Sequence, residues 1–309
     1  MKPWLFLALG IATIAAAAPR TWTSSDGKSF QGELVEAGEK EVRIKRASDF
    51  QIFKLPLERL SAEDQKFVMG IVREQWRDAG LKTGPYAARI TGKFEKGTSR
   101  QGLNYQLFGS PKWDGKKRQP VLIWLHGSGQ SGSDNEAQMG GATRVFTTEE
   151  NQKERPCFMV APQCPDASIG WNKPVADNLM ALLADLLDHL PIDEKRIYLT
   201  GSSMGGFGTF NLAAKYPGVF ACAVPLCGGG SPKAAEALKT VPMWIFHGDQ
   251  DDMVPVGRSQ TIFKAIQDAG GTLAKYSELP GEGHGITGVV YAMPGLHTWM
   301  FGQRLGTGR

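Results

Sequence analysis

The chain has 309 residues, of which 41% are hydrophobic and 21% are charged, and its formal net charge is +4. This composition excludes an intrinsically disordered chain, and the length suits one large core with a small additional module. Because the positive charge is spread along the sequence, we do not expect a nucleic-acid-binding surface.

The first 17 residues have the pattern of a secretory signal peptide. Lys2 supplies the positive charge, the apolar stretch runs from Trp4 to Ile14, and Ala15 to Ala17 form a small-residue cleavage site. We therefore expect a secreted or periplasmic protein. The apolar stretch is shorter than the about 20 residues that a membrane span needs. No later stretch qualifies either, so stable membrane insertion is not expected.

Four cysteines in an exported chain raise the question of disulfides. Cys157 and Cys164 bracket a strand-like run, and so do Cys222 and Cys227, which places the members of each pair too far apart to be bridged. Cross-pairs between the two runs stay open. Neither spacing is that of a metal site, so we expect no metal and no cofactor.

Residues 20–60 alternate between apolar and polar positions and predict a small all-β unit. A helix is predicted over residues 61–79, because Ser61 to Asp64 has the pattern of a capped first turn and an apolar stripe follows. The stripe consists of Phe67, Val68, Ile71, Val72 and Trp76.

This front segment resembles the SLA1-homology-like β-module of many exported bacterial proteins. The likeness lies in scattered aromatic, glycine and Leu-Ser positions: Arg20, Trp22, Gly27, Phe30, Leu57, Leu60, Ser61 and Asp64. It implies a module that binds a surface or a protein. A folding appendage without a ligand is the alternative.

Residues 85–309 alternate strands with helices and predict one catalytic domain with a doubly wound, mostly parallel α/β sheet. Val121 to Leu125 is apolar at every position, as expected of a central strand that is covered on both faces. The predicted strands are 88–94, 103–108, 121–126, 157–161, 197–200, 220–227, 241–247 and 273–279, and the predicted helices are 175–190, 204–216, 259–269 and 290–301.

Gly201-Ser202-Ser203-Met204-Gly205 follows a predicted strand and opens a predicted helix, which is the context of a nucleophile elbow. In such a turn the flanking glycines remove Cβ atoms that would clash, and the central serine stands above the sheet. Ser203 is therefore the predicted nucleophile.

His284 is the predicted general base, since its loop follows the last predicted strand and should lie at the same sheet edge as Ser203. The acid must come from the loop after the preceding strand, which offers Asp249, Asp251 and Asp252. Three adjacent carboxylates cannot all be desolvated, so one should point inward. His126 and His247 end predicted strands directly before glycines and are interpreted as structural turn residues that are hydrogen-bonded locally. His189 and His297 are interpreted as surface or packing residues.

Two backbone amides are expected to form the oxyanion hole. Met204 N–H follows the nucleophile at the start of a helix. The second donor is expected from the His126–Gly129 loop after an apolar central strand, at Ser128 or Gly127.

Together these residues resemble the α/β-hydrolase superfamily, and within it esterases related to family 1 carbohydrate esterases, polyhydroxybutyrate-depolymerase-like proteins and "predicted peptidase" esterases. The resemblance implies Asp251 as the acid, with Asp249 as the alternative. This chain has Gln130 where the family often has glutamate. The segments that carry the likeness are 125–129, 132–135, 161–165 with Trp171, 197–206, 247–255 and 283–284.

The substrate is less constrained by the sequence. Only residues 228–240 separate two predicted strands, which leaves no room for a helical lid, so we expect an open pocket for polymer-borne acetyl or feruloyl esters. Gln163 and Trp171 are predicted substrate-binding residues, although Trp171 could equally be a buried structural residue. The prediction is a secreted serine ester hydrolase acting through an acyl-enzyme. A serine peptidase of prolyl-oligopeptidase type, a polyhydroxyalkanoate depolymerase and a non-catalytic binding protein are the alternatives.

Overall fold

The computed structural model describes residues 19–78, 84–110, 112 and 117–306. The described residues divide into two compact units, of which the first contains those up to Ala87 together with Asp188–Pro191, and the second contains the other described residues. The predicted signal peptide lies outside the described residues. The domain limits that the sequence predicts, 20–60, 61–79 and 85–309, stay a proposal.

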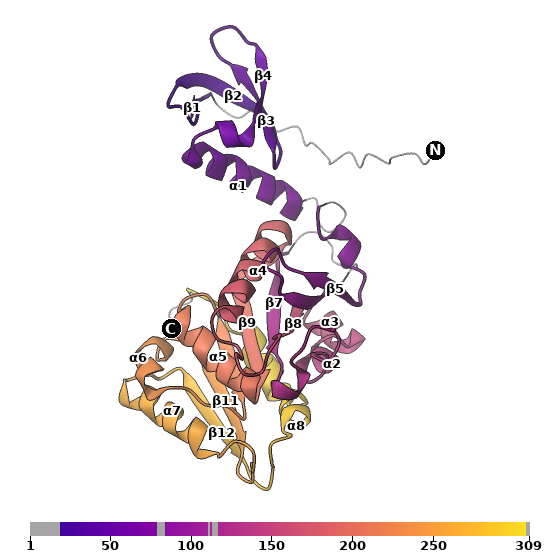
Figure 1. Ribbon diagram of the computed structural model, residues 1–309, viewed down its shortest axis with the longest axis vertical. Coiled ribbons are helices and arrows are strands. Elements are labelled where there is room, and N and C mark those ends of the chain that lie inside the picture. The colour runs from indigo at the N-terminus through magenta and orange to yellow at the C-terminus, as the bar shows by residue number, and fades with distance from the viewer. Residues whose placement is uncertain (1–18, 79–83, 111, 113–116, 307–309) are drawn as a thin grey trace. The chain divides into compact units, whose positions relative to one another are not determined.

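The first unit contains a four-stranded antiparallel sheet and a helix, α1 (Ala62–Asp78). Alternation along the strands directs Val42 and Ile44 inward, where they pack with Trp22 and with Val68 and Val72 of the helix. The side chain of Trp76 lies outside the described residues. The strands are β1 (Arg20–Thr23), β2 (Ser29–Ala37), β3 (Glu41–Arg46) and β4 (Ile52–Pro56), in this order across the sheet (Figure 1).

Asp64 joins β1 to the start of α1. Its side chain is almost fully buried and accepts hydrogen bonds from the Arg20 guanidinium and from Thr23 N–H, both at 2.7 Å. Asp64 N–H in turn donates to Ser61 Oγ at 3.2 Å, the bond of a helix N-cap. Ser61 and Asp64 are among the residues that carry the resemblance to the SLA1-homology-like module, and here they cap α1 and connect it to β1.

The second unit contains an eight-stranded sheet that is mostly parallel, which confirms the predicted fold class. Its spatial order is β12-β11-β10-β9-β7-β8-β6-β5, and β6 runs antiparallel to both β5 and β8. The strands are β5 (Phe94–Thr98), β6 (Asn104–Phe108), β7 (Gln119–Leu125), β8 (Phe158–Pro162), β9 (Ile192–Ser202), β10 (Cys222–Leu226), β11 (Met243–Gly248) and β12 (Ala274–Leu279).

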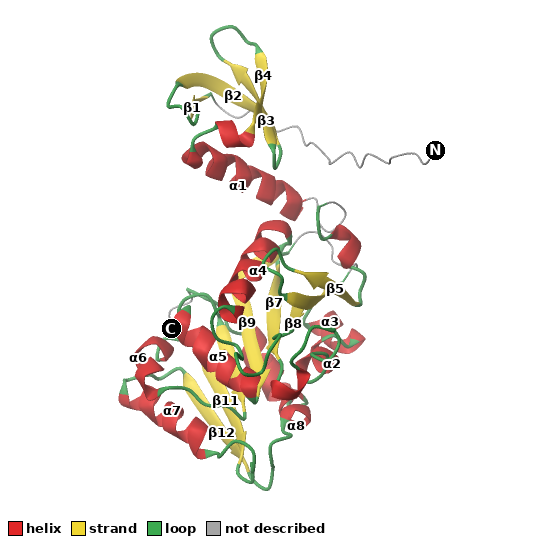
Figure 2. Ribbon diagram, in the orientation of Figure 1, coloured by secondary structure: helices red, strands yellow, loops and turns green. Residues whose placement is uncertain are grey.

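Helices cover both faces of this sheet (Figure 2). Along β10, Val224 packs into a core with residues of α2, α8 and α9, whereas its neighbour Ala223 packs into a core with residues of α5, α6 and α7. This explains why the central strands are apolar at every position. The helices are α2 (Ala142–Phe146), α3 (Glu149–Glu154), α4 (Val175–His189), α5 (Met204–Lys215), α6 (Ala235–Leu238), α7 (Gly257–Asp268), α8 (Thr287–Tyr291) and α9 (Pro294–Phe301).

Two predicted elements are wrong. In place of a strand over 88–94 the chain has a 3₁₀ turn at Ala87–Arg89 and starts β5 at Phe94, because Gly92 adopts φ +82° and turns the backbone there. In place of one helix over 290–301 there are two, α8 and α9, since Pro294 opens a new helix. The short helices α2 and α3 were not predicted, as five or six residues are too few to show a helical period.

None of the described helices is both long and apolar enough to cross a membrane. The four cysteines are buried and free.

Candidate active site

Ser203 occupies a strained turn between β9 and α5. Its backbone has φ +57° and ψ −120°, a conformation that costs a residue other than glycine about 1–3 kcal/mol. Ser203 N–H donates to Leu226 O at 2.9 Å, which ties the turn to the end of the neighbouring strand β10. The predicted nucleophile therefore has the backbone geometry of a nucleophile elbow.

The glycines on either side of Ser203 are required by close backbone contacts. A Cβ atom at Gly201 would lie 2.4 Å from the carbonyl oxygen of Gly205. A Cβ atom at Gly205 would lie 1.9 Å from the carbonyl oxygen of Leu125, in the central strand β7. Both distances are far below van der Waals contact, so glycine is needed at each position for this turn to form.

His284 and Asp251 form a hydrogen-bonded pair from the loops that follow β12 and β11. His284 Nδ1 lies 2.7 Å from Asp251 Oδ2, and the side chain of Asp251 is completely buried. The second carboxylate oxygen accepts hydrogen bonds from Met253 N–H at 3.0 Å and Val254 N–H at 2.8 Å. Because Nδ1 of His284 faces a carboxylate, Nδ1 carries the proton and Nε2 can accept one.

The pKa of Asp251 lies below its ordinary value. Burial by itself raises this pKa, but the hydrogen bonds that the carboxylate accepts outweigh burial. In order of size they come from Val254 N–H, His284, Cys227 and Met253 N–H. Asp251 is thus held as an anion beside His284, as an acid that orients a histidine requires.

The two other predicted acid candidates do not contact His284. Asp249 Oδ1 accepts a hydrogen bond from Gly281 N–H at 2.7 Å and so connects the two loops. Asp252 is exposed. Among the three carboxylates on this loop, Asp251 is the one that faces the histidine.

Ser203 and His284 lie at the same, carboxyl edge of the sheet, where Cys227 connects their positions. Ser202 pairs in register with Leu226, so Cys227, the next residue after β10, stands level with Ser203. Cys227 Sγ lies 3.5 Å from the carbonyl oxygen of His284. The Cys227 sulfur, a carboxylate oxygen of Asp251 and a ring nitrogen of His284 all lie within 4.8 Å of one another. Burial raises the pKa of the Cys227 thiol to about 12, so the neutral thiol stands beside the pair at neutral pH.

The loop after β7 approaches Ser203 from the other side. A Cβ atom built on Gly127 would lie 3.5 Å from the Cβ of Ser203, and Ser128 opens a 3₁₀ turn, Ser128–Gln130. Met204 is the first residue of α5, so its N–H has no partner within the helix. The predicted donors Met204, Ser128 and Gly127 therefore lie on the two segments that flank the nucleophile.

His126 stabilises this loop. It is buried, its Nδ1 lies 2.6 Å from Gly127 O, and its Nε2 accepts a hydrogen bond from Cys164 N–H at 2.9 Å. Burial is the main reason that the pKa of His126 is lowered. A neutral imidazole with both nitrogens bonded to the main chain fits the structural interpretation that the sequence suggested.

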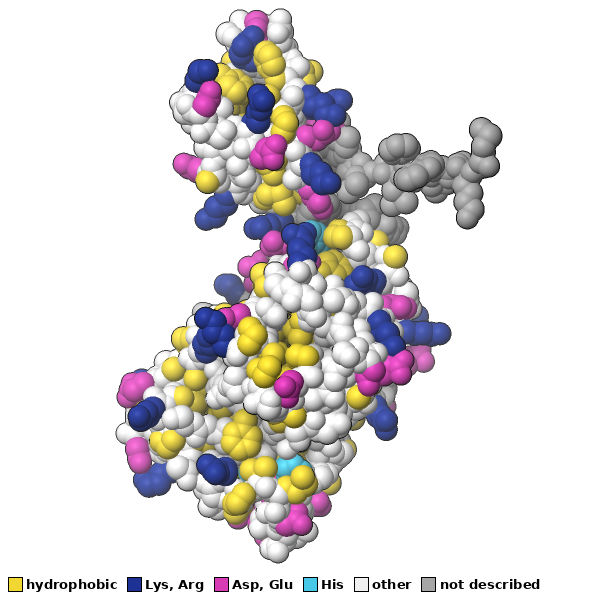
Figure 3. All heavy atoms as spheres, viewed as in Figure 1, with side chains coloured by type: hydrophobic (Ala, Val, Ile, Leu, Met, Phe, Trp, Pro, Cys, Tyr) yellow, Lys and Arg dark blue, Asp and Glu magenta, His cyan; other side chains and the backbone are white. Residues whose placement is uncertain are grey.

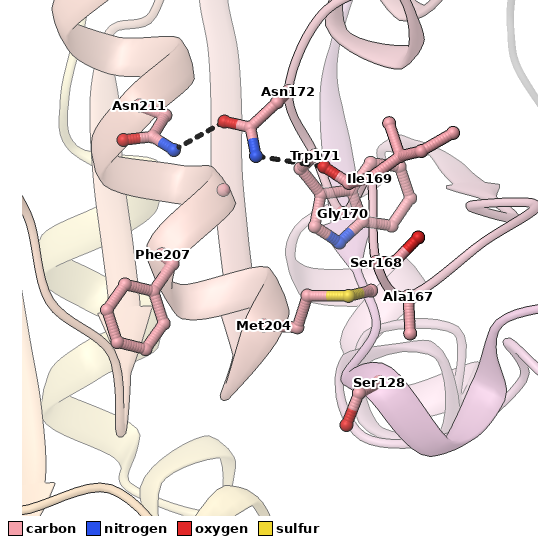
Figure 4. A pocket seen from close by; sticks show the side chains of 11 residues that line it. Ser128, Ala167, Ser168, Ile169, Gly170, Trp171, Asn172, Met204, Phe207 and Asn211 are labelled. Atoms are coloured by element: carbon pink, nitrogen blue, oxygen red, sulfur yellow. Dashed lines mark hydrogen bonds between the residues drawn. The ribbon is translucent and has the colours of Figure 1, made fainter.

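A pocket of about 330 Å³ lies between α5 and the loop 167–172 (Figure 4). Ser128 and Met204 line it, which connects the pocket to the segments beside Ser203. Its walls include the side chains of Phe207 and Ile169. Asn211 Nδ2 donates to Asn172 Oδ1 at 3.1 Å across its rim.

The side chains of the two predicted substrate-binding residues, Gln163 and Trp171, form hydrogen bonds within the protein. Trp171 lines the pocket but is only 2% exposed, and its Nε1–H donates to His126 O at 3.1 Å. The Gln163 carboxamide accepts from Asn135 N–H at 2.7 Å and donates to Asp134 Oδ1 at 2.8 Å. Burial and bonding of this kind favour the structural alternative for Trp171 and a loop-stabilising role for Gln163.

Sequence reasoning missed Phe207, Asn211 and Asn172 as pocket residues. Met204, Phe207 and Asn211 lie three and four residues apart on α5 and therefore share one helix face. Since that helix begins at the elbow, the spacing was a usable signal. Asn172 comes from a loop without a regular period and gave no such signal.

Charged side chains do not gather by sign on the visible face of the molecule. Figure 3 shows Lys and Arg interspersed with Asp and Glu over both units. This distribution agrees with the charge pattern of the sequence.

Comparison with known proteins then identifies the family. The Esterase family, described as "Putative esterase", matches residues 103–265, more than half of the chain. The chain belongs to this esterase family. The predicted resemblance to α/β-hydrolase serine esterases is thereby confirmed at the level of the family.

Three known proteins resemble parts of this chain. A crystal structure of a thermostable esterase is 31% identical with a TM-score of 0.62, covering 69% of this chain and 63% of that one. Poly(3-hydroxyalkanoate) depolymerase C of Paucimonas lemoignei is 32% identical over 125 residues, 36% of this chain and 28% of the depolymerase. A bifunctional acetylxylan esterase/xylanase of Neocallimastix patriciarum is 32% identical over 77 residues, 25% of this chain and 12% of that enzyme. The chain thus spans less than two thirds of each of these proteins.

Proposed function

We propose that this protein is a secreted serine carboxylic-ester hydrolase whose catalytic triad is Ser203, His284 and Asp251. The observation that carries the proposal is a strained serine turn and a bonded histidine–carboxylate pair at the same sheet edge. Membership of the Esterase family supports the reaction class. The signal-peptide pattern of residues 1–17 supports export to the periplasm or the medium.

The reaction follows from the roles of these three groups. Ser203 Oγ attacks the ester carbonyl carbon while His284 Nε2 takes its proton, and Asp251 stabilises the imidazolium that forms. The tetrahedral intermediate then expels the alcohol, which receives the proton from His284, and leaves an acyl group on Ser203. A water molecule then attacks the acyl carbon while His284 Nε2 takes its proton, and the bond to Ser203 Oγ breaks as His284 returns the proton to Oγ and the carboxylic acid leaves.

Two backbone amides serve as the oxyanion hole in this proposal. Met204 N–H is available because it begins α5, and the positive end of the helix dipole lies at the same place. Ser128 N–H or Gly127 N–H supplies the second donor, supported by the close approach of Gly127 to Ser203. Such donors stabilise the charge that develops on the carbonyl oxygen.

Carbohydrate-linked acetyl or feruloyl esters are the proposed substrates. The pocket combines an apolar wall, from Phe207 and Ile169, with the two amide groups of Asn172 and Asn211 at its rim. An apolar wall suits the acyl group, and rim amides can bond sugar hydroxyls. The partial match to an acetylxylan esterase supports this choice. The match to a poly(3-hydroxyalkanoate) depolymerase keeps polyester hydrolysis as a second candidate.

The test is a substrate panel for the wild type and for Ser203→Ala. The panel contains p-nitrophenyl acetate, acetylated xylan, a feruloyl sugar, polyhydroxybutyrate and a short peptide. We expect wild-type turnover of p-nitrophenyl acetate and of the sugar esters, and none by Ser203→Ala. Faster cleavage of polyhydroxybutyrate or of the peptide would replace the proposed substrate, and equal activity of Ser203→Ala would overturn the proposed nucleophile.

The N-terminal unit is proposed to bind a surface or a protein. Its resemblance to an exported β-module supports this role. Removal of residues 20–79 should leave turnover of p-nitrophenyl acetate intact and weaken retention on an insoluble polymer-borne substrate.

A further inference from the structure

His247 is a buried histidine that the proposed reaction does not use. It stands at the carboxyl end of β11, its relative exposure is 0%, and the sequence suggested only a turn residue bonded within its own loop. Part of that interpretation fits, because His247 Nε2 lies 2.8 Å from the carbonyl oxygen of Val254. Its other contacts are with Asp251 and with Ser259 of α7.

The same nitrogen also faces the acid of the proposed triad. His247 Nε2 lies 3.2 Å from Asp251 Oδ2, the oxygen that His284 Nδ1 contacts at 2.7 Å from its own loop. Both atoms that face Nε2, a carbonyl oxygen and a carboxylate oxygen, are acceptors. Nε2 of His247 must therefore carry a proton, which it donates to Val254 O, while the carboxylate oxygen lies beside it at the longer distance.

A second buried side chain orients the ring. His247 Nδ1 lies 2.7 Å from Ser259 Oγ of α7, and that hydroxyl lies 2.9 Å from Gly228 O, one residue beyond Cys227. Ser259 has a relative exposure of 0%, so water does not compete for these bonds. A continuous polar chain thus runs from the end of β10 through α7 and β11 to Asp251.

We propose that His247 is a positioning residue that presents Asp251 to His284. Met253 N–H and Val254 N–H bond one carboxylate oxygen and His284 bonds the other. His247 Nε2 lies 3.2 Å from that second oxygen and bonds the carbonyl of Val254, whose N–H bonds the first. The carboxylate cannot rotate without breaking a buried hydrogen bond. His247 is too deeply buried to meet substrate, so it acts through Asp251 alone. This inference rests on the proposed function.

The test compares two conservative variants with a matched control. In His247→Gln the side-chain amide nitrogen lies near the position of Nε2 and keeps a donor for Val254 O beside Asp251. In His247→Asn the shorter amide reaches only the side of Ser259. The control is His297→Asn, because His297 is also buried and its Nε2 bonds a main-chain carbonyl, that of Tyr291, at 2.7 Å.

We expect His247→Asn to lower kcat for p-nitrophenyl acetate about tenfold with KM unchanged, because the loop that holds Asp251 loses about one buried hydrogen bond. His247→Gln should recover most of the loss, and His297→Asn should keep the wild-type kcat. The downfield proton resonance of His284 Nδ1–H, assigned by its loss in His284→Gln, should move upfield in His247→Asn and not in His247→Gln. Ser259→Ala, which removes only the hydroxyl, should lower kcat less than His247→Asn and serves if that variant does not fold.

Wild-type kcat and an unmoved resonance in folded His247→Asn, or in Ser259→Ala where His247→Asn does not fold, would overturn the inference. An equal loss of kcat in the Gln and Asn variants would also overturn it, because burial and not the donor would then matter. Ser203→Ala, measured alongside, separates the two levels. If it keeps its activity the proposed triad fails, whereas an inactive Ser203→Ala together with an unaffected His247→Asn rejects only the role of His247.

Discussion

Asp251 Oδ2 lies 2.7 Å from His284 Nδ1, whereas Asp249, two residues earlier in the same loop, bonds Gly281 N–H. Asp251→Asn should therefore lower kcat by about 10⁴ with little change in KM, because the amide favours the wrong tautomer of the histidine. Asp249→Asn and Asp252→Asn, measured on the same ester, are the controls and should each keep most of the activity. A larger loss in Asp249→Asn than in Asp251→Asn would assign the acid to Asp249.

The contact between Gly205 and β7 predicts a severe packing defect. In Gly205→Ala the new methyl group would overlap the carbonyl oxygen of Leu125, so we expect a loss of at least about 3 kcal/mol in the free energy of unfolding. Gly288→Ala is the control, since a Cβ there meets nothing within 4 Å and the residue lies in α8. Urea denaturation should show Gly288→Ala equal to or slightly more stable than the wild type. A stable Gly205→Ala protein would contradict the tight turn.

The lowered pKa of Asp251 predicts a contribution to stability that depends on pH. The pKa of this carboxyl is about 3.9 in the unfolded chain and lower in the folded one, so its contribution is present above about pH 4. It is lost as the pH falls through the folded pKa. Urea midpoints measured from pH 5 downward should fall less steeply for Asp251→Asn than for the wild type. Parallel curves would show that Asp251 has the same pKa in both states.

Gln163 is expected to contribute to stability more than to substrate binding. Gln163→Leu would leave the buried Asn135 N–H without its acceptor, at a cost of about 1–3 kcal/mol in the free energy of unfolding. KM for the sugar ester should stay at the wild-type value in the variant that remains folded. A raised KM with unchanged stability would restore the substrate-binding interpretation.

The positions of Ser203 and His284 could be predicted because they depend on chain order and on which edge of a parallel sheet a loop reaches. The alternation of strands and helices showed that order directly. The choice among Asp249, Asp251 and Asp252 could not be made from the residues alone, because it depends on which carboxylate the amides of Met253 and Val254 bond.

Several other features could not be predicted because they depend on contacts between residues that are far apart in the sequence. His247 looked like a turn residue because its other partner, Ser259, lies on a different element of the fold. Trp171 and Gln163 could not be separated from substrate-binding residues, since only packing shows that both are buried. The wrong strand over 88–94 came from apolar residues that a glycine turn interrupts.

Covalent labelling with a fluorophosphonate, followed by mass-spectrometric mapping of the adduct, shows directly whether Ser203 is the nucleophile. Ser202→Ala is the matched control, because Ser202 is the adjacent serine and lies within β9. We expect one adduct, on Ser203, that persists in Ser202→Ala and is absent in Ser203→Ala. An adduct on another residue, or undiminished labelling of Ser203→Ala, would contradict the proposed mechanism.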